Sequence, residues 1–295
     1  MWVAVRQRFR AFHEDLNLTR DQVEDGIGKA IRVTQALERA YNGRVADQPP
    51  LRIVGSWGKG TQVRPSADID IMVEFTPAVL ARFEARVGNR QSQLLQEVRA
   101  SLLDAYPQTD MRGDGQVVMV QFNTITVEVV PVFDLPGGQY LMPDTNNGGR
   151  WKTVDPLAQI ALIEAIDTRT NGNTRALTKI IKMWQREKNV PLKSFLIELL
   201  VADFMSTYQY AQQDYYYYDW FVRDFLRALV GRAGSGLLVP GTGEWIWLGA
   251  DWHTKAEAAL AVAETACEWE RLDYDVTAGQ EWQTIFGARI PIHVL

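Results

Sequence analysis

Apolar and polar residues alternate most regularly in the stretch 68–75, which reads DIDIMVEF. Successive side chains of a β-strand point to opposite faces of its sheet. The pattern therefore predicts a strand whose apolar residues, Ile69 and Ile71 among them, pack on the core. Asp68 and Asp70 then emerge together on the other face, so that two carboxylates stand side by side near one end of the strand.

Similar patterns predict three further strands. A short apolar run, Leu51–Val54, is followed by a Gly-Ser turn at which we expect a helix to begin. Residues 116–122 and 124–130 favour two strands joined by a tight connection, and Glu128 is the one acid within the second.

Helical spacing of apolar residues predicts most of the remaining elements. Thr19 and Gln22 form a capping box at the start of the first helix. We expect helices over about residues 17–42, 76–106 with a break near 88–89, 156–166, 174–188, from 194 onward, and 255–271.

Two glycine-containing segments are expected to be loops. Residues 136–155 are rich in Gly, Asn and Pro, and loops of this length are uncommon unless they are functional or mobile. A plain domain connector explains the segment equally well. Residues 231–252 form the second such loop. We place a domain boundary near the first, which gives a core domain at 1–155 with an N-terminal packing helix, and a helical domain at 156–295.

Composition narrows the class of protein. The 295 residues are enough for two medium domains. The net charge of −5 argues against a surface that holds long nucleic acids. The single cysteine, Cys267, excludes an internal disulfide, and the three histidines share no metal-ligand spacing. No apolar run spans a bilayer and the N-terminus lacks the apolar segment of a signal peptide, so we expect a cytoplasmic protein without membrane attachment.

The paired aspartates suggest a chemistry. Adjacent carboxylates repel each other unless a cation lies between them, and Mg²⁺ prefers one or two carboxylates plus substrate phosphates. Taken alone, a D-x-D pattern is more often a solvent-facing pair on an edge strand. Here Gly55 and Ser56 open a helix about a dozen residues earlier, where backbone N–H groups bind anions. A phosphate-binding turn beside a metal pair indicates phosphoryl or nucleotidyl transfer.

The pattern G-S-x-x-x-x-T followed by D-I-D resembles the polymerase-β-type nucleotidyltransferases. The motif GSWGKGT at residues 55–61 is most similar to the motif of one branch of this superfamily. That branch contains oligoadenylate synthase, cyclic GMP-AMP synthase and the bacterial CD-NTases of CBASS antiphage defence. The resemblance covers nearly the whole chain. It implies an α+β fold in which a nucleotidyltransferase core with a mixed sheet precedes a C-terminal, oligoadenylate synthase-like helical domain that completes the nucleotide cleft.

The resemblance requires a third carboxylate on a later strand. Glu128 matches it, because the family pattern is an acid followed by Val-Pro and an aromatic, and this chain reads EVVPVF at residues 128–133. Most relatives carry aspartate at this position, and the extra methylene of glutamate moves the carboxylate by more than an ångström. Judged from the residues alone, Glu128 is a lone acid on the wet face of a strand. Glu74 and Asp134 have the same strand parity, and we interpret them as rim residues.

The resemblance also implies contacts to the nucleotide from both domains. The phosphate-binding turn supplies contacts to the β and γ phosphates, while the helical domain supplies a lysine shortly before a tryptophan and a serine at a helix start. The matching residues are Gly55, Ser56, Thr61, Lys182 and Ser194.

Two features of the helical half have plainer explanations from the residues alone. Lys182 belongs to a basic stripe with Arg175, Lys179 and Arg186, and such a stripe is usually a solvated helix face. Phe195, which the resemblance would place beneath a base, also fits an ordinary packing role.

The resemblance implies a Mg²⁺-dependent nucleotidyltransferase that joins NTPs into a cyclic di- or oligonucleotide second messenger for bacterial antiviral defence and releases pyrophosphate. Two Mg²⁺ ions, replaceable by Mn²⁺, would be held by the catalytic residues Asp68, Asp70 and Glu128. The expected partners are the NTP substrates, a downstream effector reached through the diffusible product, and a regulatory protein. Two alternatives stay open: an enzyme that adds nucleotides to RNA 3′ ends, and an inactive nucleotide-binding module.

Overall fold

The computed structural model describes residues 3–43, 47–66 and 68–294. The N-terminal half contains α1 (Val3–Leu16), α2 (Arg20–Asn42), β1 (Arg52–Ile53), α3 (Gly55–Lys59), β2 (Asp68–Glu74), α4 (Pro77–Glu84), α5 (Arg90–Ala105), β3 (Asp110–Asp114), β4 (Val117–Gln121), β5 (Thr126–Asp134), β6 (Tyr140–Asp144) and β7 (Arg150–Val154). The C-terminal half contains α6 (Pro156–Arg169), α7 (Asn173–Glu187), α8 (Ser194–Thr207), α9 (Tyr218–Val230), β8 (Gly236–Leu238), β9 (Trp245–Trp247), α10 (His253–Arg271) and α11 (Asp275–Phe286). Short 3₁₀ turns lie at Asn146–Gly148, Tyr215–Tyr217 and Gly287–Arg289.

The described strands of the N-terminal half form one mixed sheet. Its order is β1-β2-β5-β4-β3, with the β6–β7 hairpin joined to β5. Only β2 and β5 pair in parallel, and the other pairs of this sheet are antiparallel. A parallel pair needs a long crossover connection, and α4, α5 and the β3–β4 hairpin supply it. The mixed α+β architecture expected from the sequence is confirmed.

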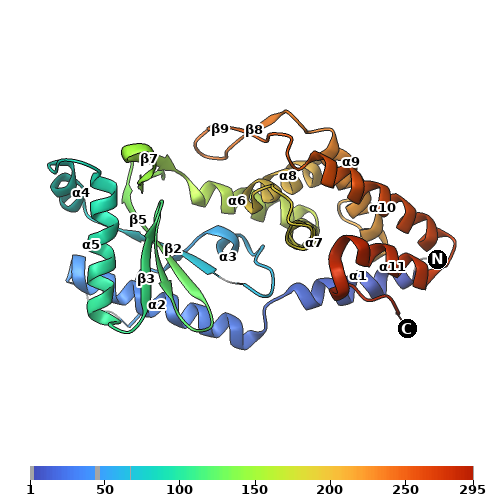
Figure 1. Cartoon of the computed structure of the whole chain (residues 1–295), viewed down its shortest axis with the longest axis horizontal. Coiled ribbons are helices and arrows are strands. Elements are labelled where there is room, and N and C mark those ends of the chain that lie inside the picture. Colours follow the sequence, from blue (N-terminus) through green and yellow to red (C-terminus); the bar gives the residue numbers. More distant parts are fainter. Residues whose placement is uncertain (1–2, 44–46, 67, 295) are drawn as a thin grey trace.

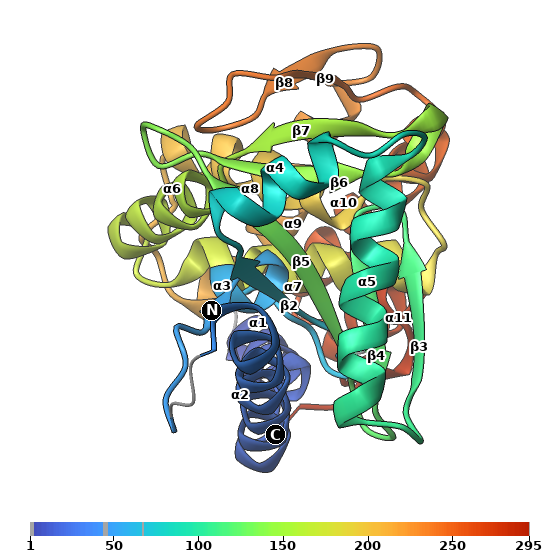
Figure 2. The same ribbon diagram turned by 90° about the vertical axis from the view of Figure 1, so that its left-hand side faces the viewer.

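Helices cover one face of the sheet and leave the other for the C-terminal half. α2 and α5 pack on the covered face, and α5 crosses in front of the strands in Figure 2. Ile69, Ile71, Val127 and Val129 point into this layer and are fully buried. The opposite face of β2 therefore carries the polar half of the alternating pattern.

The helical half has its own core, and α1 belongs to it. Figure 1 shows the sheet at one end of an elongated molecule and the C-terminal helices at the other, with α1 and α2 running along one edge between them. Phe9 of α1 is fully buried, and its ring lies 5.1 Å from that of Trp282 and 6.3 Å from that of Tyr218. Residues 3–16 thus pack against helices of the C-terminal half, including Tyr218–Val230 and Asp275–Phe286.

Local signals explain several helix boundaries. The capping box at Thr19 is present, since its hydroxyl accepts from the Gln22 N–H while the Gln22 side chain accepts from the Thr19 N–H. The expected break within residues 76–106 separates α4 from α5, and Asn89 caps α5 by accepting from the Ser92 N–H. Both predictions are confirmed.

The two segments expected to be loops are instead β-hairpins. Within 136–155, β6 pairs with β7, and β6 also joins β5, so the loop expected there is wrong. Within 231–252, β8 pairs with β9. Glycines at the turns and short strands hide the alternation that marks longer strands, and the pairing depends on neighbours far away in the sequence.

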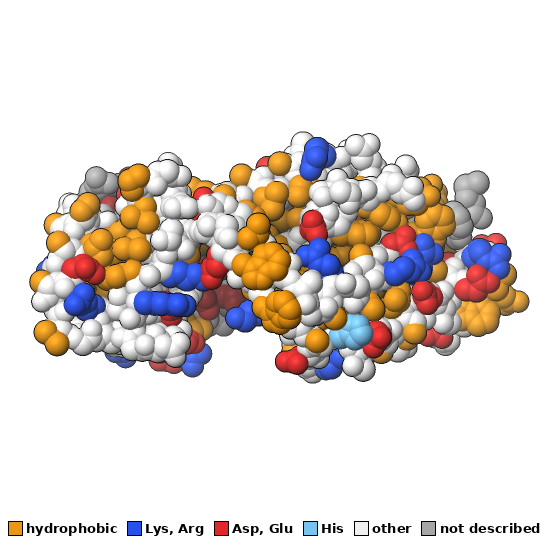
Figure 3. Space-filling view, turned by 90° about the horizontal axis from the view of Figure 1, so that it is seen from above, with side chains coloured by type: hydrophobic (Ala, Val, Ile, Leu, Met, Phe, Trp, Pro, Cys, Tyr) orange, Lys and Arg blue, Asp and Glu red, His pale blue; other side chains and the backbone are white. Residues whose placement is uncertain are grey.

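None of the helices in the described part of the chain has the length and apolar character needed to cross a membrane. Viewed from above, the molecule narrows between its two halves, and both acidic and basic side chains gather around the hollow there (Figure 3).

Candidate active site

Asp70 and Glu128 are direct neighbours on adjacent strands. The parallel register of β2 and β5 sets Asp70 opposite Glu128 and Asp68 opposite Thr126. The three acids therefore share one face of the sheet, as the alternation predicts. Ile69, which lies between the two aspartates, is fully buried on the other face.

Burial and mutual repulsion raise the pKa of two of these carboxyl groups. Burial is the main cause for Asp70, followed by the charge of Asp68, and together they raise its pKa to about 6. Burial and then the charge of Asp70 raise the pKa of Glu128 to about 7. A side-chain hydrogen bond joins the two carboxyl groups, so the pair holds a proton near neutral pH. Such a pair is stabilised when a cation replaces the proton.

The acids suit a hard divalent cation, although they are not already arranged as a cage for one. Across residues 3–43, 47–66 and 68–294, no group of three or more acidic, His or Cys side chains lies ready to hold a metal ion. Asp68 is exposed while Asp70 is half-buried. An all-oxygen donor set that leaves room for water and substrate phosphate fits Mg²⁺.

Gly55 lies against Asp70 at the start of the short helix α3. Its φ is +58°, and a Cβ at this position would lie 1.8 Å from Oδ2 of Asp70. Only glycine allows this approach without strain. No side chain caps α3, and both Gly55 and Ser56 line the adjacent cleft. The backbone N–H groups of this turn are therefore available to an anion next to the acids.

A cleft of about 380 Å³ opens beside the aspartates and is lined from both halves. The sheet half contributes Val54, Gly55, Ser56, Lys59, Gln62, Val63, Ser66, Asp68 and Asp70, and the helical half contributes Pro156, Gln159, Lys182, Arg186, Ser194, Phe195 and Glu198. Glu128 is not part of this lining and reaches the cleft through its contact with Asp70.

A buried ionic network forms the floor of the cleft. Glu198 is 2% exposed, and its carboxylate accepts from Nζ of Lys59 at 2.6 Å and from Nζ of Lys182 at 2.5 Å. The hydroxyl of Thr61 also donates to Glu198, at 2.6 Å. Burial would raise the pKa of Glu198, but the two lysines outweigh it and lower the pKa. Neither Lys59 nor Glu198 was predicted from the sequence, because only the fold brings these two residues together.

The structure places Thr61 and Lys182 differently from the direct phosphate contacts that the resemblance implies. Thr61 is fully buried and lies beneath the cleft, because its hydroxyl is bonded to Glu198. Lys182 lines the cleft, yet its ammonium donates to Glu198 and, at 3.1 Å each, to the carbonyl and hydroxyl oxygens of Thr61. All three of its N–H donors are thus occupied.

Ser194 and Phe195 lie in the cleft wall at the start of α8. Ser194 is the first residue of the helix, and its hydroxyl donates to Oε1 of Gln185 at 3.1 Å. The Nζ of Lys59 lies 5.1 Å from the centre of the Phe195 ring. Both side chains are half-buried and face the same space as Ser56.

The basic stripe of α7 is not a solvated face. Arg175 donates to the carbonyl of Lys59 at 2.8 Å, and Arg186 donates to the carbonyls of Val63 at 3.1 Å and Pro65 at 3.0 Å. The stripe therefore binds the segment 59–65, which connects α3 to the strand that carries Asp68 and Asp70.

The two rival acids lie away from the cleft and are not on its rim. Glu74 is at the far end of β2, where it forms an ion pair with Arg52 at 3.3 Å. Asp134 is exposed at the end of β5. Both line a different hollow at the opposite end of these strands.

A mixed sheet with acids on one parallel strand pair, facing a glycine turn and a helical half, is the fold of the polymerase-β-type nucleotidyltransferases. The chain belongs to the Second Messenger Oligonucleotide or Dinucleotide Synthetase domain family, whose model matches residues 3–166. The class and family expected from the motifs are confirmed.

Two curated relatives show how far the similarity extends. A cyclic AMP-AMP-AMP synthase of Acinetobacter sp. is 28% identical over 158 residues, which cover 52% of this chain and 46% of that protein. A probable cyclic nucleotide synthase of Bacillus cereus is 21% identical over 278 residues, or 81% of each chain. The match to the first of these relatives thus spans about half of that relative's length.

Solved structures share the fold over the full chain. Escherichia coli CdnC with ATP has a TM-score of 0.72 and 18% identity, over 99% of this chain and 100% of that chain. Vibrio cholerae DncV, a cyclic AMP-GMP synthase, has a TM-score of 0.66 and 14% identity in its complex with a linear intermediate, over 98% of this chain and 88% of that chain. At these identities the likeness establishes the fold.

Proposed function

We propose that the protein joins NTPs into a cyclic di- or oligonucleotide second messenger, with release of pyrophosphate, as part of bacterial antiviral defence. The observation that carries this proposal is the register of β2 and β5, which brings Asp70 and Glu128 together beside Gly55 at a cleft lined from both halves. The family match and the names of the curated relatives support the same reaction class.

Each acid has a role in this proposal. Asp68, Asp70 and Glu128 would hold two divalent cations, Mg²⁺ or in its place Mn²⁺, which when bound would neutralise the triphosphate and lower the pKa of the attacking ribose hydroxyl. Glu128 would also accept the proton of that hydroxyl.

Contacts from both halves orient the nucleotide. The N–H groups at Gly55 and Ser56 bind the β and γ phosphates, and Ser194 approaches the phosphates from the other wall. Phe195 provides an apolar surface beneath a base. Thr61 and Lys182 do not contact the nucleotide in this proposal. They hold Glu198, and with it the floor of the cleft, in position.

The bond changes balance without a further reagent. The hydroxyl oxygen of one nucleotide attacks the α phosphorus of the next, a new phosphodiester bond forms, and the bond to the bridging oxygen of the β phosphate breaks. The hydroxyl proton goes to Glu128 and pyrophosphate leaves. A second such step within the linear product closes the ring.

Two kinds of partner follow from this activity. A diffusible cyclic nucleotide requires a downstream effector that binds it. A structure of Escherichia coli CdnC in complex with a HORMA protein supports a regulatory protein partner for this chain as well.

The proposal is tested by incubating the purified protein with each pair of NTPs and Mg²⁺, without RNA. We expect pyrophosphate release and small phosphatase-resistant products in mass spectrometry, and Asp70→Asn should lower the rate by at least about a hundredfold because it removes a cation ligand. Dependence on an RNA 3′ end would instead identify a nucleotide-adding enzyme. NTP binding with no pyrophosphate from the wild type under any condition would identify an inactive binding module.

A further inference from the structure

Three cationic side chains of the described residues line the catalytic cleft, and two of them are already paired with an acid. Lys59 and Lys182 are buried and form ion pairs with Glu198 at 2.6 and 2.5 Å. Arg186 is the third, and it forms no ion pair with any residue that the structure describes. It is also exposed. Arg186 therefore offers the cleft a positive charge that a ligand can reach.

The guanidinium group of Arg186 is anchored at one end and unoccupied at the other. Its Nη1 donates to the carbonyl oxygens of Val63 at 3.1 Å and Pro65 at 3.0 Å. Within residues 3–43, 47–66 and 68–294, its Nε and Nη2 atoms donate to no acceptor. An arginine carries five N–H donors, so three remain, and those of Nε and Nη2 lie side by side. Two parallel donors of this kind match two oxygens of one phosphate group.

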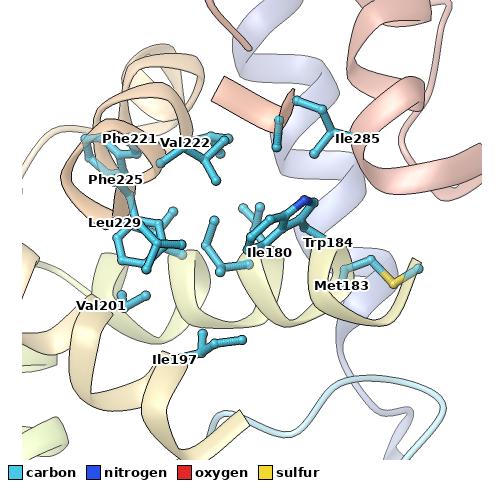
Figure 4. Close-up of a cluster of buried hydrophobic side chains, with 14 of the residues drawn as sticks. Ile180, Met183, Trp184, Ile197, Val201, Phe221, Val222, Phe225, Leu229 and Ile285 are labelled. Carbon is cyan, nitrogen blue, oxygen red and sulfur yellow. The ribbon is translucent and has the colours of Figure 1, made fainter. Parts of the chain in front are cut away.

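Helix α7 is a rigid support for Arg186. The apolar side of this helix is buried in the helical core, where Ile180 is fully buried and Trp184 is 1% exposed. Figure 4 shows both side chains on the side of α7 that faces Val222 and Ile285 of the neighbouring helices. Arg186 follows Trp184 by two residues, which is about 200° around the helix axis. The guanidinium group thus extends from the opposite side of a helix that the core holds in place.

Arg186 also interacts with Asp68, one of the acids of the site. Both residues line the cleft. Partial burial lowers the pKa of Arg186, and the negative charge of Asp68 acts in the opposite direction. Once a divalent cation compensates the charge of Asp68, the charge of Arg186 is available to an anion that binds the same cation.

We propose that Arg186 binds the β and γ phosphates of the incoming NTP. This inference rests on the proposed function, because it requires an NTP in this cleft. The N–H groups of Arg186 donate to phosphate oxygens from the helical half, and those at Gly55 and Ser56 donate from the sheet half. Lys182 could make this contact only by giving up one of its three hydrogen bonds. Arg186 thus makes the phosphate contact that the resemblance assigns to Lys182.

Isothermal titration calorimetry of the full chain in Mg²⁺ tests this contact. The ligands are α,β-methylene-ATP, which cannot release pyrophosphate, inorganic tripolyphosphate, which has no base, and AMP, which lacks the β and γ phosphates. We expect Arg186→Gln to weaken binding of the first two about tenfold to a hundredfold, because it removes a charged contact made by two donors. The affinity for AMP should be unchanged. Arg186→Lys keeps the charge but loses the paired donors, so it should recover only part of the loss.

Lys179→Gln controls for the loss of a positive charge on α7. The Nζ of Lys179 donates to Oδ1 of Asn17 at 2.7 Å, and Lys179 is not part of the cleft lining. This variant should bind all three ligands as the wild type does. Circular dichroism confirms that each variant is folded. Should Arg186→Gln not fold, Arg186→Lys provides the same comparison with a smaller expected loss.

Three results would overturn the proposal. In the first, the wild type binds neither tripolyphosphate nor α,β-methylene-ATP. In the second, the Arg186 variants bind both ligands as the wild type does. In the third, they lose AMP binding to the same extent, which would mean that Arg186 acts through the segment 59–65 or the α phosphate. Cyclic products from the wild type together with the second result would refute this contact alone, whereas the expected binding losses without any product would refute only the proposed function.

Discussion

Asp70 and Glu128 make the site sensitive to pH in a direction that the structure defines. Their pKa values rise from 3.8 to about 6 and from 4.5 to about 7 on folding. The folded protein therefore holds more protons than the unfolded chain within this window. The stability that these groups contribute is present below about pH 4 and is lost as the pH rises through about 7. A bound cation reverses this dependence of stability on pH, because the cation favours the deprotonated carboxyl pair.

We accordingly predict that Mg²⁺ raises the melting temperature of the nucleotide-free protein more at about pH 8 than at about pH 5. The physical reason is that Mg²⁺ must displace the shared proton of Asp70 and Glu128 at the lower pH. Thermal melts with and without Mg²⁺ across this range provide the measurement. Asp70→Asn should flatten the difference, and an equal Mg²⁺ effect at both pH values would contradict the prediction.

A substitution at Gly55 tests the close contact between the phosphate-binding turn and the carboxylate of Asp70. In Gly55→Ala the new methyl would overlap the Asp70 carboxylate, so we expect loss of NTP and Mg²⁺ binding in calorimetry and a stability loss of about 1–3 kcal/mol. Gly43 has a similar φ of +62°, but a Cβ at this position would have no neighbouring atom within 4 Å among the described residues. Gly43→Ala should therefore cost about 1 kcal/mol and leave NTP binding unchanged. Equal binding by both variants would argue against the contact.

The three acids of the site could be predicted from the sequence, but the residues that form the floor of the cleft could not. Period-two alternation places Asp68 and Asp70 on one face, and the family pattern singles out Glu128. Lys59 and Glu198 lie 139 residues apart, and no local pattern brings them together. One signal could have identified Glu198 as a residue of the cleft. Glu198 follows Ser194 by one helical turn, so the two side chains lie on the same face of the helix.

Helix α7 connects the two halves along its polar edge. Arg175 and Arg186 bind carbonyls of the segment 59–65, while Lys182 reaches Glu198 on α8. The arginine contacts cross from the helical half to the segment that leads into β2. The position of Asp68 and Asp70 relative to the helical wall of the cleft therefore depends on α7.

Among the residues of this connection, we expect substitution of Glu198 to lower the free energy of unfolding the most. Glu198→Gln removes the charge that balances the buried ammonium groups of Lys59 and Lys182, and we predict a loss of about 3–5 kcal/mol in urea unfolding. Adding Lys182→Met should recover part of it, because one buried cation is then gone. Glu264→Gln, in an exposed pair with Arg227, serves as a control and should change stability by less than about 0.5 kcal/mol. Additive losses in the double variant would show that the residues are not coupled.

Elements with strong local signals were predictable, and elements formed by distant pairing were not. The capped helices α2 and α5 and the alternating strand β2 follow from their own residues. The hairpins β6–β7 and β8–β9 are short and rich in glycine nearby, so composition suggested loops. α1 was not anticipated as a helix, because its amphipathic face is completed only by partners in the C-terminal half.

Taken as a whole, the molecule has two main cores, and its N-terminus stabilises the one farther along the chain. α1 supplies Val5, Phe9, Phe12 and Leu16 to the helical core, all fully buried. α2 supplies Val33 and Leu37 to the sheet core. The two consecutive helices thus join both cores.

We predict that Phe9→Ala destabilises the protein by about 3–5 kcal/mol, because it leaves a cavity between the rings of Trp282 and Tyr218. Denaturant unfolding followed by circular dichroism measures the change. Val3 lies on the same helix and is 52% exposed, so Val3→Ala should have little effect. A small loss for Phe9→Ala would mean that α1 contributes little to the helical core.

The burial of α1 among late helices sets an order of events during synthesis. Residues 3–16 leave the ribosome before residues 218 and 282, whose rings enclose Phe9. Helix α1 must therefore wait, with its apolar side uncovered, until α11 has been made. A nascent chain that already displays Asp68, Asp70 and Glu128 still lacks a finished scaffold until then.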